Sequence, residues 1–280
     1  MSALSWPAPA KINLFLHVTG RRDDGYHLLQ TAFQFLDICD QLDFSLRADN
    51  KIRRQANYDT VADEDDLVVR AAKLLREYAN KDFGVDIHID KRLPMGGGLG
   101  GGSSNAATTL VALNSLVGLN LKTDELADLG LKLGADVPVF VRAHAAWAEG
   151  VGEILEEITP PEDWYVLIVP DCEVSTAEIF AATDLTRNTP AITIRDFLAG
   201  AGHNDCEKVV RDRYPEVAGV LDWLSRQYAP RMTGTGACVF TNFATRVLAE
   251  ELAENLPKAW LSFVTKGLNR SPLAERLKLE

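Results

Sequence analysis

Residues 11–18 alternate between apolar and polar side chains. The even-numbered positions from 12 to 18 are all aliphatic, whereas the odd-numbered positions include Lys11, Asn13 and a histidine. Because successive side chains of a β-strand point to opposite faces, this pattern predicts a half-buried strand. The alternation by itself favours a solvated Lys11, which would lie beside Asn13 on the polar face.

Further elements follow from the same kind of pattern. A turn, TGRRDDGYH, precedes a mixed apolar run over residues 28–46, which predicts one or two strands. Asp63 or Asp65 is expected to cap a helix that begins near Leu67, because apolar residues then recur at helical spacing. Residues 85–90 alternate again and predict a strand.

A glycine-rich stretch comes next. Residues 93–106 read LPMGGGLGGGSSNA and lead into a segment with a helical apolar stripe. A flexible linker would not normally separate a buried strand from a buried helix. Glycine permits backbone conformations and close approaches that a Cβ prevents, and a helix N-terminus offers free N–H groups. The stretch therefore predicts a phosphate site.

Other anion-binding motifs compete for this stretch. Gly96, Gly98 and Gly101 satisfy the dinucleotide pattern G-x-G-x-x-G, but no acidic residue ends a second strand about twenty residues later. A dinucleotide-dependent oxidoreductase remains an alternative. The Walker pattern needs a lysine directly after its glycines, and this stretch contains none, which excludes a Walker-type nucleoside triphosphatase.

The second half of the chain has a different pattern. Asp136 is expected on a short turn before VPVFV, which we expect to be a strand, and TPPED at residues 159–163 indicates a boundary. We therefore expect two domains, residues 1–158 and 159–280. Strands and helices in the second half, with a helix starting at STAE, predict an α+β arrangement.

Composition limits the classes of partner. Of the 280 residues 46% are hydrophobic and 25% charged, and the net charge of −11 would repel nucleic acid and anionic membranes. We expect neither as a partner, so an anionic ligand must be held by local geometry. The four cysteines form no CxxC pair, and no 18-residue apolar span occurs, so we expect a reduced, cytoplasmic protein.

The glycine-rich stretch resembles the phosphate loop of the GHMP small-molecule kinases, in which P-x-x-x-G-L-G precedes serines that open a helix. PAKINLFLHV near the N-terminus and MTGTGACVF near the C-terminus are similar to two further segments of that family, in the same order. Together with GRRDDGYHLL and LGADVPVF, they are most similar to the members that act on a cytidine diphosphate-linked methylerythritol. The resemblance spans most of the chain.

This resemblance implies an α+β, two-domain GHMP kinase fold. The N-terminal domain would be like domain 2 of ribosomal protein S5, the C-terminal domain would be ferredoxin-like, and the active cleft would lie between them. The implied activity is ATP-dependent phosphorylation of a hydroxyl in isoprenoid precursor synthesis, with Mg²⁺. A kinase for homoserine, mevalonate or a sugar is an alternative, and a nucleotide-binding protein without catalysis is another.

The resemblance also implies roles for individual residues. The catalytic pair would be Lys11 and Asp136, and the adenine would lie near Leu67 and Lys91. The ATP phosphates would be held by Pro94, Met95, Gly96, Gly97, Gly98, Leu99, Gly100, Gly101, Gly102, Ser103 and Ser104. The substrate would be contacted by Asn13, Tyr26, His27, Thr176, Phe180 and Asn204. At Asp66 the family more often has an asparagine.

Phosphoryl transfer requires a phosphate cradle, a metal ion and a group that accepts the hydroxyl proton. Asp136 can accept that proton, and Lys11 can partly neutralise the reacting oxygens. No cluster of carboxylates marks a metal site built by the protein, so Mg²⁺ is expected to be held by phosphates, water and a loop serine. A cytosine base is expected to stack on Tyr26 or Phe180 and to form a hydrogen bond with His27.

Overall fold

A computed structural model describes residues 5–57 and 61–278, whose strands form one ten-stranded sheet. The main path through the sheet is β3-β4-β2-β10-β7-β9-β8; β1 and β5 also pair with β2, and β6 pairs with β5. The described strands are β1 (Trp6–Arg21), β2 (His27–Arg47), β3 (Ile52–Ala56), β4 (Gly84–Asp90), β5 (Ala146–Glu149), β6 (Ile154–Glu157), β7 (Trp164–Val169), β8 (Arg231–Met232), β9 (Val239–Phe243) and β10 (Leu261–Leu268).

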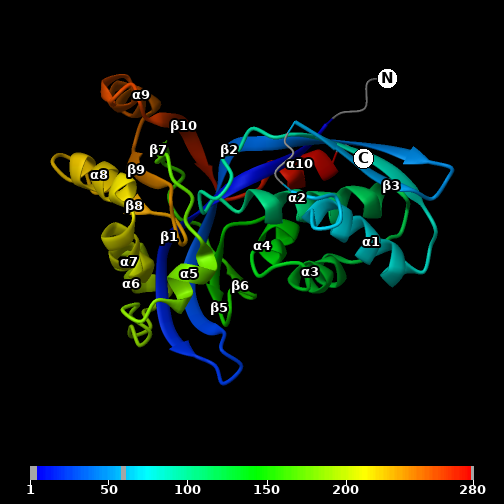
Figure 1. The fold of residues 1–280 in the computed structure, drawn as a ribbon, viewed down its shortest axis with the longest axis horizontal. Helices are drawn as coiled ribbons and strands as arrows, with labels where there is room; N and C mark the ends of the chain where they lie inside the picture. Colours follow the sequence, from blue (N-terminus) through cyan, green and yellow to red (C-terminus); the bar gives the residue numbers. More distant parts are fainter. Residues whose placement is uncertain (1–4, 58–60, 279–280) are drawn as a thin grey trace.

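The long hairpin of β1 and β2 runs through the centre of the molecule (Figure 1). Its register extends from Trp6 opposite Leu42 to Arg21 opposite His27, and the predicted turn closes it. The apolar run after the turn is a single strand of 21 residues. β2 also pairs with β4, β5 and β10, which makes it the interior strand that joins the two halves of the chain.

Several helices lie toward the two ends of the molecule, whereas α4 and α5 lie between them (Figure 1). Figure 1 shows α1, α2 and α3 at one end and α7, α8 and α9 at the other. None of the helices within the described ranges is long and apolar enough to cross a membrane. Their bounds are α1 (Leu67–Ala79), α2 (Gly101–Leu116), α3 (Thr123–Leu131), α4 (Val137–Arg142), α5 (Thr176–Ala181), α6 (Ile194–Leu198), α7 (Asp205–Arg213), α8 (Pro215–Leu224), α9 (Arg246–Asn255) and α10 (Pro272–Leu277).

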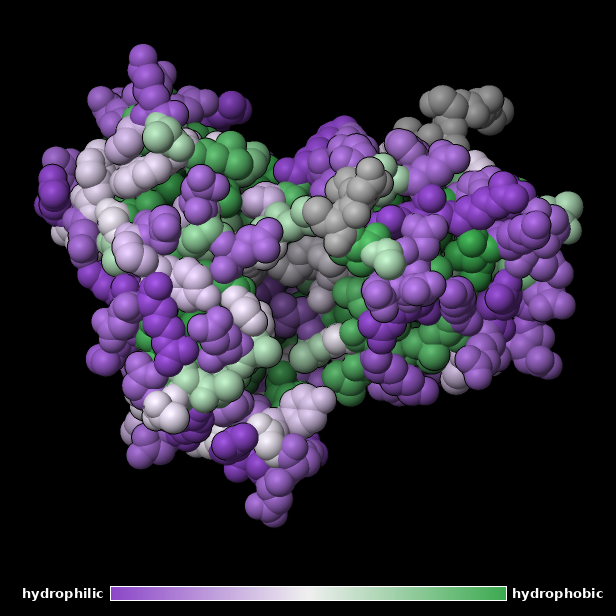
Figure 2. Space-filling view, viewed as in Figure 1, coloured by the Kyte–Doolittle hydropathy of each residue, from purple (hydrophilic) through white to green (hydrophobic). Residues whose placement is uncertain are grey.

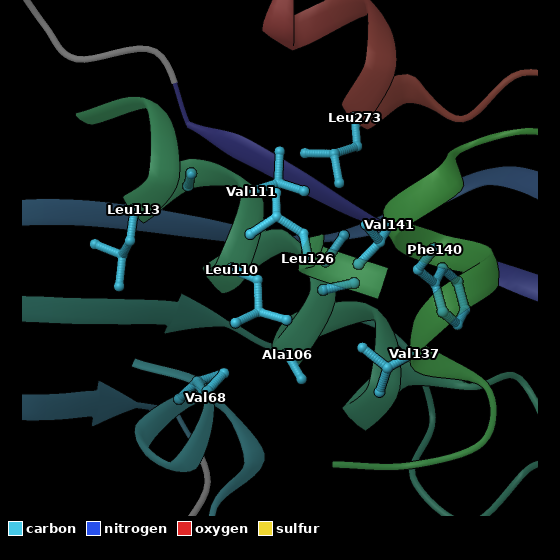
Figure 3. Packing of buried hydrophobic residues seen from close by; sticks show 14 of the residues in the cluster. Val68, Ala106, Leu110, Val111, Leu113, Leu126, Val137, Phe140, Val141 and Leu273 are labelled. Carbon is cyan, nitrogen blue, oxygen red and sulfur yellow. The ribbon is translucent and has the colours of Figure 1, made fainter. Parts of the chain in front are cut away.

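One core cluster surrounds α2. Figure 3 shows Ala106 and Leu110 of this helix near Val68 of α1 and Val137 of α4. All ten residues from 104 to 113 are buried, because neighbouring helices and the sheet cover α2 on every side. Leu273 of α10 belongs to the same cluster, so the last described helix packs against the first half of the chain.

Two further clusters complete the core. One lies among α5, α7, α8 and α9 and the strands β7 and β9. The other combines residues of both halves, including Ile12 and Phe15 of β1 with Leu167 of β7 and Phe240 of β9. The two halves therefore share an apolar core beside β1, and the boundary after residue 158 stays a prediction.

The expectation of a half-buried first strand is wrong. Both faces of β1 are buried from Ala8 to Val18, and Lys11 and Asn13 are each only 3% exposed. The reason is that residues of β1 contribute to all three clusters, so neither face meets solvent. Alternating polarity identified the strand correctly, but it could not show that the polar side chains are buried together.

Two local expectations also need correction. VPVFV belongs to helix α4, not to a strand; Pro138 lies in the first helical turn, where a missing N–H is tolerated, and residues 137–141 are all buried. The cap of α1 is Asp66, which accepts a hydrogen bond from the Val68 N–H, and not Asp63 or Asp65. Residues that are all buried show no helical periodicity in the sequence, which explains why the apolar run VPVFV resembles a strand.

Candidate active site

A cleft of about 1090 Å³ lies between the two halves of the chain. Figure 2 shows the surface hollowed in this region. All but two of the site residues predicted from the sequence line this cleft, although they come from both halves. Those that line the cleft are Lys11, Asn13, Tyr26, His27, Leu67, Lys91, the ten residues 94–103, Asp136, Thr176 and Phe180. Ser104 and Asn204 are not among the lining residues.

The glycine loop, residues 94–104, packs against a second glycine-rich segment, residues 233–238. Gly96, Gly98 and Gly100 have positive φ, and a Cβ on Gly98 would lie 2.5 Å from the carbonyl oxygen of Thr233. The N–H of Cys238 donates to the carbonyl of Gly97 at 3.2 Å. Some of the glycines are therefore required by contact between two backbones, and not by a ligand alone.

The glycine loop ends at the N-terminus of α2. Gly100, in a left-handed conformation, occupies the N-cap, and no side chain caps the helix. The next three residues, 101–103, line the cleft, so the free N–H groups of the first turn lie beside it. Backbone donors and the positive end of the helix dipole favour an anion at this position.

Two buried oxygens lie in the same first turns of α2. Within residues 5–57 and 61–278, the Oγ of Ser104 and the Oδ1 of Asn105 have no hydrogen-bond partner. Asn105 lines the cleft, whereas Ser104 is fully buried behind it. Asn105 carried no signal in the sequence, because an asparagine in an alanine-rich helix has no characteristic pattern.

Lys11 lines the cleft, and its ammonium group contacts three oxygen atoms. Its Nζ donates to the Oδ1 of Asn13 at 2.6 Å and to the carbonyl of Gly98 at 3.1 Å. The same Nζ lies 3.3 Å from the Oδ2 of Asp136 and 5.2 Å from the centre of the Phe33 ring. These contacts hold a buried cation beside both the glycine loop and a carboxylate.

Asp136 presents its carboxylate to the cleft. The residue precedes α4, but its side chain makes no capping hydrogen bond to that helix. Its φ of −83° and ψ of −13° differ from the extended conformation that capping residues usually adopt. The side chain is 33% exposed, so the carboxylate remains accessible to a ligand.

Asn13 connects the two glycine-rich segments. Its side chain accepts from Lys11 and donates to the Oγ1 of Thr31 at 3.0 Å. Its backbone N–H donates to the Oγ1 of Thr233 at 2.9 Å, and that hydroxyl lies 3.4 Å from the carbonyl of Gly98. Asn13 thus orients Lys11 as well as lining the cleft.

Two ion pairs, Lys91 with Asp40 and Arg54 with Asp66, lie where the adenine is expected to bind. The Nζ of Lys91 lies 2.5 Å from Asp40, whose carboxylate also accepts from the N–H groups of Arg92 and Leu93. A Cβ on Gly101 would lie 2.9 Å from that Nζ, so this lysine is beside the start of α2. Asp66 pairs with Arg54 at 2.7 Å while it caps α1.

Aromatic residues form the opposite end of the cleft. The rings of His27 and Phe180 are stacked, with centroids 5.0 Å apart and planes at 24°. Tyr26 is 65% exposed, and the Oγ1 of Thr176 lies 2.8 Å from that of Thr235. Burial and then the nearby guanidinium groups of Arg187 and Arg21 lower the pKa of His27.

Asn204 does not line the cleft itself but forms hydrogen bonds with a segment that does. Its Nδ2 donates to the carbonyls of Met232 and Gly234, both at 2.8 Å, and its Oδ1 accepts from the N–H of Cys206 at the start of α7. Gly234 lines the cleft. Asn204 therefore supports the second glycine-rich segment, and a direct contact with substrate stays a prediction.

Comparison with known proteins gives consistent matches over both halves. The GHMP kinases N terminal domain matches residues 66–144, and the GHMP kinases C terminal domain matches residues 185–261. A protein of Shewanella piezotolerans named 4-diphosphocytidyl-2-C-methyl-D-erythritol kinase is 56% identical over 277 residues, which cover 98% of this chain and 97% of that protein.

Solved structures agree with these matches. A crystal structure of 4-(cytidine 5'-diphospho)-2C-methyl-D-erythritol kinase has a TM-score of 0.81 and 32% identity, and the match covers 94% of this chain and 99% of that chain. A mevalonate kinase has a TM-score of 0.71 at 16% identity, with 96% and 100% of the two chains covered, and so shares the fold.

Proposed function

The chain belongs to the GHMP kinase family, and we propose that it transfers a phosphoryl group from ATP to the 2-hydroxyl of 4-diphosphocytidyl-2-C-methyl-D-erythritol, in non-mevalonate isoprenoid synthesis. It is an ATP-dependent small-molecule kinase, so the dinucleotide oxidoreductase alternative is wrong. The observation that carries the proposal is the contact of Lys11 with both Asp136 and the glycine loop in one cleft.

The ATP phosphates would bind the glycine loop and the N-terminus of α2. Free N–H groups in the first turn donate to phosphate oxygens without the need for a Walker lysine. Lys91 adds a positive charge beside this turn, although Asp40 pairs with it. The adenine would then lie near Leu67, which lines the adjoining part of the cleft.

Magnesium would be held beside the glycine loop when ATP is bound. No group of three or more His, Cys, Asp and Glu side chains is arranged for a metal within the part of the chain that the structure describes, so the protein would supply few ligands. The Oδ1 of Asn105 and the hydroxyl of Ser103 are oxygen donors of the type that Mg²⁺ prefers. When bound, the ion would neutralise charge on the transferred group.

The acceptor hydroxyl would bind beside Asp136. In the transfer step a bond forms between the hydroxyl oxygen and the γ-phosphorus, while the bond to the β,γ-bridging oxygen of ADP breaks. The Oδ2 of Asp136 accepts the hydroxyl proton, and the ammonium group of Lys11 stabilises negative charge on the reacting oxygens. The two groups lie 3.3 Å apart without a ligand, which would reduce the entropic cost of aligning them with the substrate.

The cytosine base would bind at the aromatic end of the cleft. A base that continues the plane of His27 can form a hydrogen bond with that ring while its face contacts Phe180 or Tyr26. The proposed ligand is a small molecule, and we propose neither nucleic acid nor a membrane as a partner. We place the enzyme in the cytoplasm, where ATP is available.

Release of ADP tests the proposed acceptor. Purified protein with ATP and Mg²⁺ would be supplied in turn with the cytidyl substrate, mevalonate and homoserine. Turnover confined to the cytidyl substrate is the expected result. Comparable turnover with mevalonate or homoserine would contradict the proposed specificity. An absence of ADP release with all three compounds would reject the proposed acceptor.

A further inference from the structure

Arg187 joins the two halves of the chain at the aromatic end of the cleft. Its Nε donates to the Nε2 of His27 at 3.0 Å. Its two terminal nitrogens donate to three carbonyls at and after the end of α5, those of Phe180, Ala182 and Leu185. One guanidinium group therefore holds both members of the stacked pair, His27 by its ring and Phe180 by its backbone.

This contact determines which nitrogen of His27 carries a proton. A guanidinium group can only donate hydrogen bonds, so the Nε2 of His27 must present a lone pair. A neutral imidazole has one N–H, which then lies on Nδ1. The lowered pKa of His27 agrees with a neutral ring, because burial and the charges of Arg187 and Arg21 all oppose protonation.

The Nδ1–H group is available to a ligand. Among the residues described here, none forms a hydrogen bond with this nitrogen, and His27 lines the cleft. A cytosine base carries a lone pair on N3 and can accept from such a donor. A uracil base carries a hydrogen on N3, so two donors would face each other and both would lose a partner.

We propose that Arg187 is a positioning residue, which fixes His27 as a hydrogen-bond donor and so makes the cleft select cytosine over uracil. This inference rests on the proposed function, because it assumes that the base of the cytidyl substrate meets His27. The rigid fork of the arginine suits the role, since it reaches the His27 ring and the α5 carbonyls at the same time.

The first experiment reads the tautomer directly. Long-range ¹H–¹⁵N NMR of the full chain with labelled histidine distinguishes protonated from bare ring nitrogens, and the spectrum of His27→Gln assigns the signals. In the wild type, Nδ1 should be protonated and Nε2 bare, whereas Arg187→Met should show both tautomers. A wild-type ring with its hydrogen on Nε2 would overturn the inference.

The second experiment measures base selectivity by calorimetry, with a non-hydrolysable ATP analogue present. The ligands are the cytidyl substrate and its uridine counterpart. Wild type should bind the cytidine compound at least about tenfold more tightly, and Arg187→Met should lose most of that ratio. Arg213→Met is the matched control, because Arg213 pairs with Asp184 near α5 without contacting His27, and it should keep the ratio.

The pH dependence of base selectivity distinguishes control of the tautomer from a purely structural role of Arg187. In Arg187→Met, one of the charges that oppose protonation of His27 is gone, so a falling pH should protonate the ring, restore the Nδ1–H group and bring back the preference for cytosine. Arg21, opposite His27 in the β1–β2 hairpin, also opposes protonation of this ring, and Asp24 lines the same cleft. Equal weakening of both ligands by Arg187→Met at every pH would overturn the inference. Selective binding by an enzyme that shows no turnover would instead contradict the proposed function alone.

Discussion

The Nζ of Lys11 lies 3.3 Å from the Oδ2 of Asp136, although the lysine belongs to the first strand and the aspartate precedes α4. The backbone N–H of Lys11 also donates to the carbonyl of Leu99 at 3.0 Å, which places β1 directly beside the glycine loop. A buried cation and a carboxylate thus lie beside the glycine loop, and the proposed phosphoryl transfer depends on this arrangement.

Asp136→Asn should abolish most of the turnover. The amide has nearly the same shape but cannot accept the hydroxyl proton, so kcat should fall about 100- to 10,000-fold while ATP binding is retained. Single-turnover kinetics and equilibrium binding of ATP would check this prediction. Asp128→Asn, on the exposed face of α3, is the control. Near-normal turnover of Asp136→Asn would exclude this residue as the base.

Lys11→Met should affect catalysis more than stability. Loss of the ammonium group removes positive charge from the reacting oxygens, so kcat should fall by at least about 100-fold. The free energy of unfolding should fall by about 2 kcal/mol, because the single hydroxyl hydrogen of Thr233 can replace Lys11 at Asn13 Oδ1 or at the Gly98 carbonyl, but not at both. Urea unfolding beside steady-state kinetics separates the two effects. A large loss of stability with normal kcat would show a structural role.

Gly98→Ala should destabilise the protein. Its φ is +76°, and the added Cβ would lie 2.5 Å from the Thr233 carbonyl, so the free energy of unfolding should fall by at least about 2 kcal/mol. Gly219→Ala, inside α8 with nothing within 4 Å of the new Cβ, should instead stabilise the protein by up to about 1 kcal/mol. Urea unfolding midpoints compare the pair, and equal effects would contradict the proposed packing of the two glycine-rich segments.

Acid should weaken the fold through His17. Burial, followed by the charge of His203, lowers the pKa of His17 below 6.5, and the Nδ1 of this buried ring has no partner among the described residues. The unfolded chain then binds the proton more readily, so this stability is present above about pH 6.5 and is lost as the pH falls toward the folded pKa. Urea unfolding at about pH 7.5 and 5.5 measures the loss.

His17→Gln should reduce that loss of stability. Glu207 has an effect of opposite sign, because burial raises its pKa and favours the protonated, folded form at low pH. The comparison is therefore best made in a Glu207→Gln background. An identical pH dependence with and without His17 would contradict the assignment.

Some elements of this protein could be predicted from the sequence because they depend on local chemistry alone. The glycines before an alanine-rich helix predict a phosphate site, because the requirement for bare backbone and free N–H groups belongs to the segment itself. Alternation predicted β1 and β4, and STAE predicted the start of α5, where Ser175 accepts from the N–H of Glu178. For Lys11 and Asp136, by contrast, local pattern favoured a solvated residue and an ordinary turn, and only the family resemblance implied a catalytic role, which stays a prediction.

The tertiary structure decided which distant groups meet. Burial of both faces of β1 follows from three clusters that pack around it, and the helical form of VPVFV accompanies complete burial, which removes any visible period. The pairing of Asp40 with Lys91 and of Arg187 with His27 depends on strand order and on the path of the chain after α5. No local propensity encodes such contacts, because they form only when the sheet brings remote segments together.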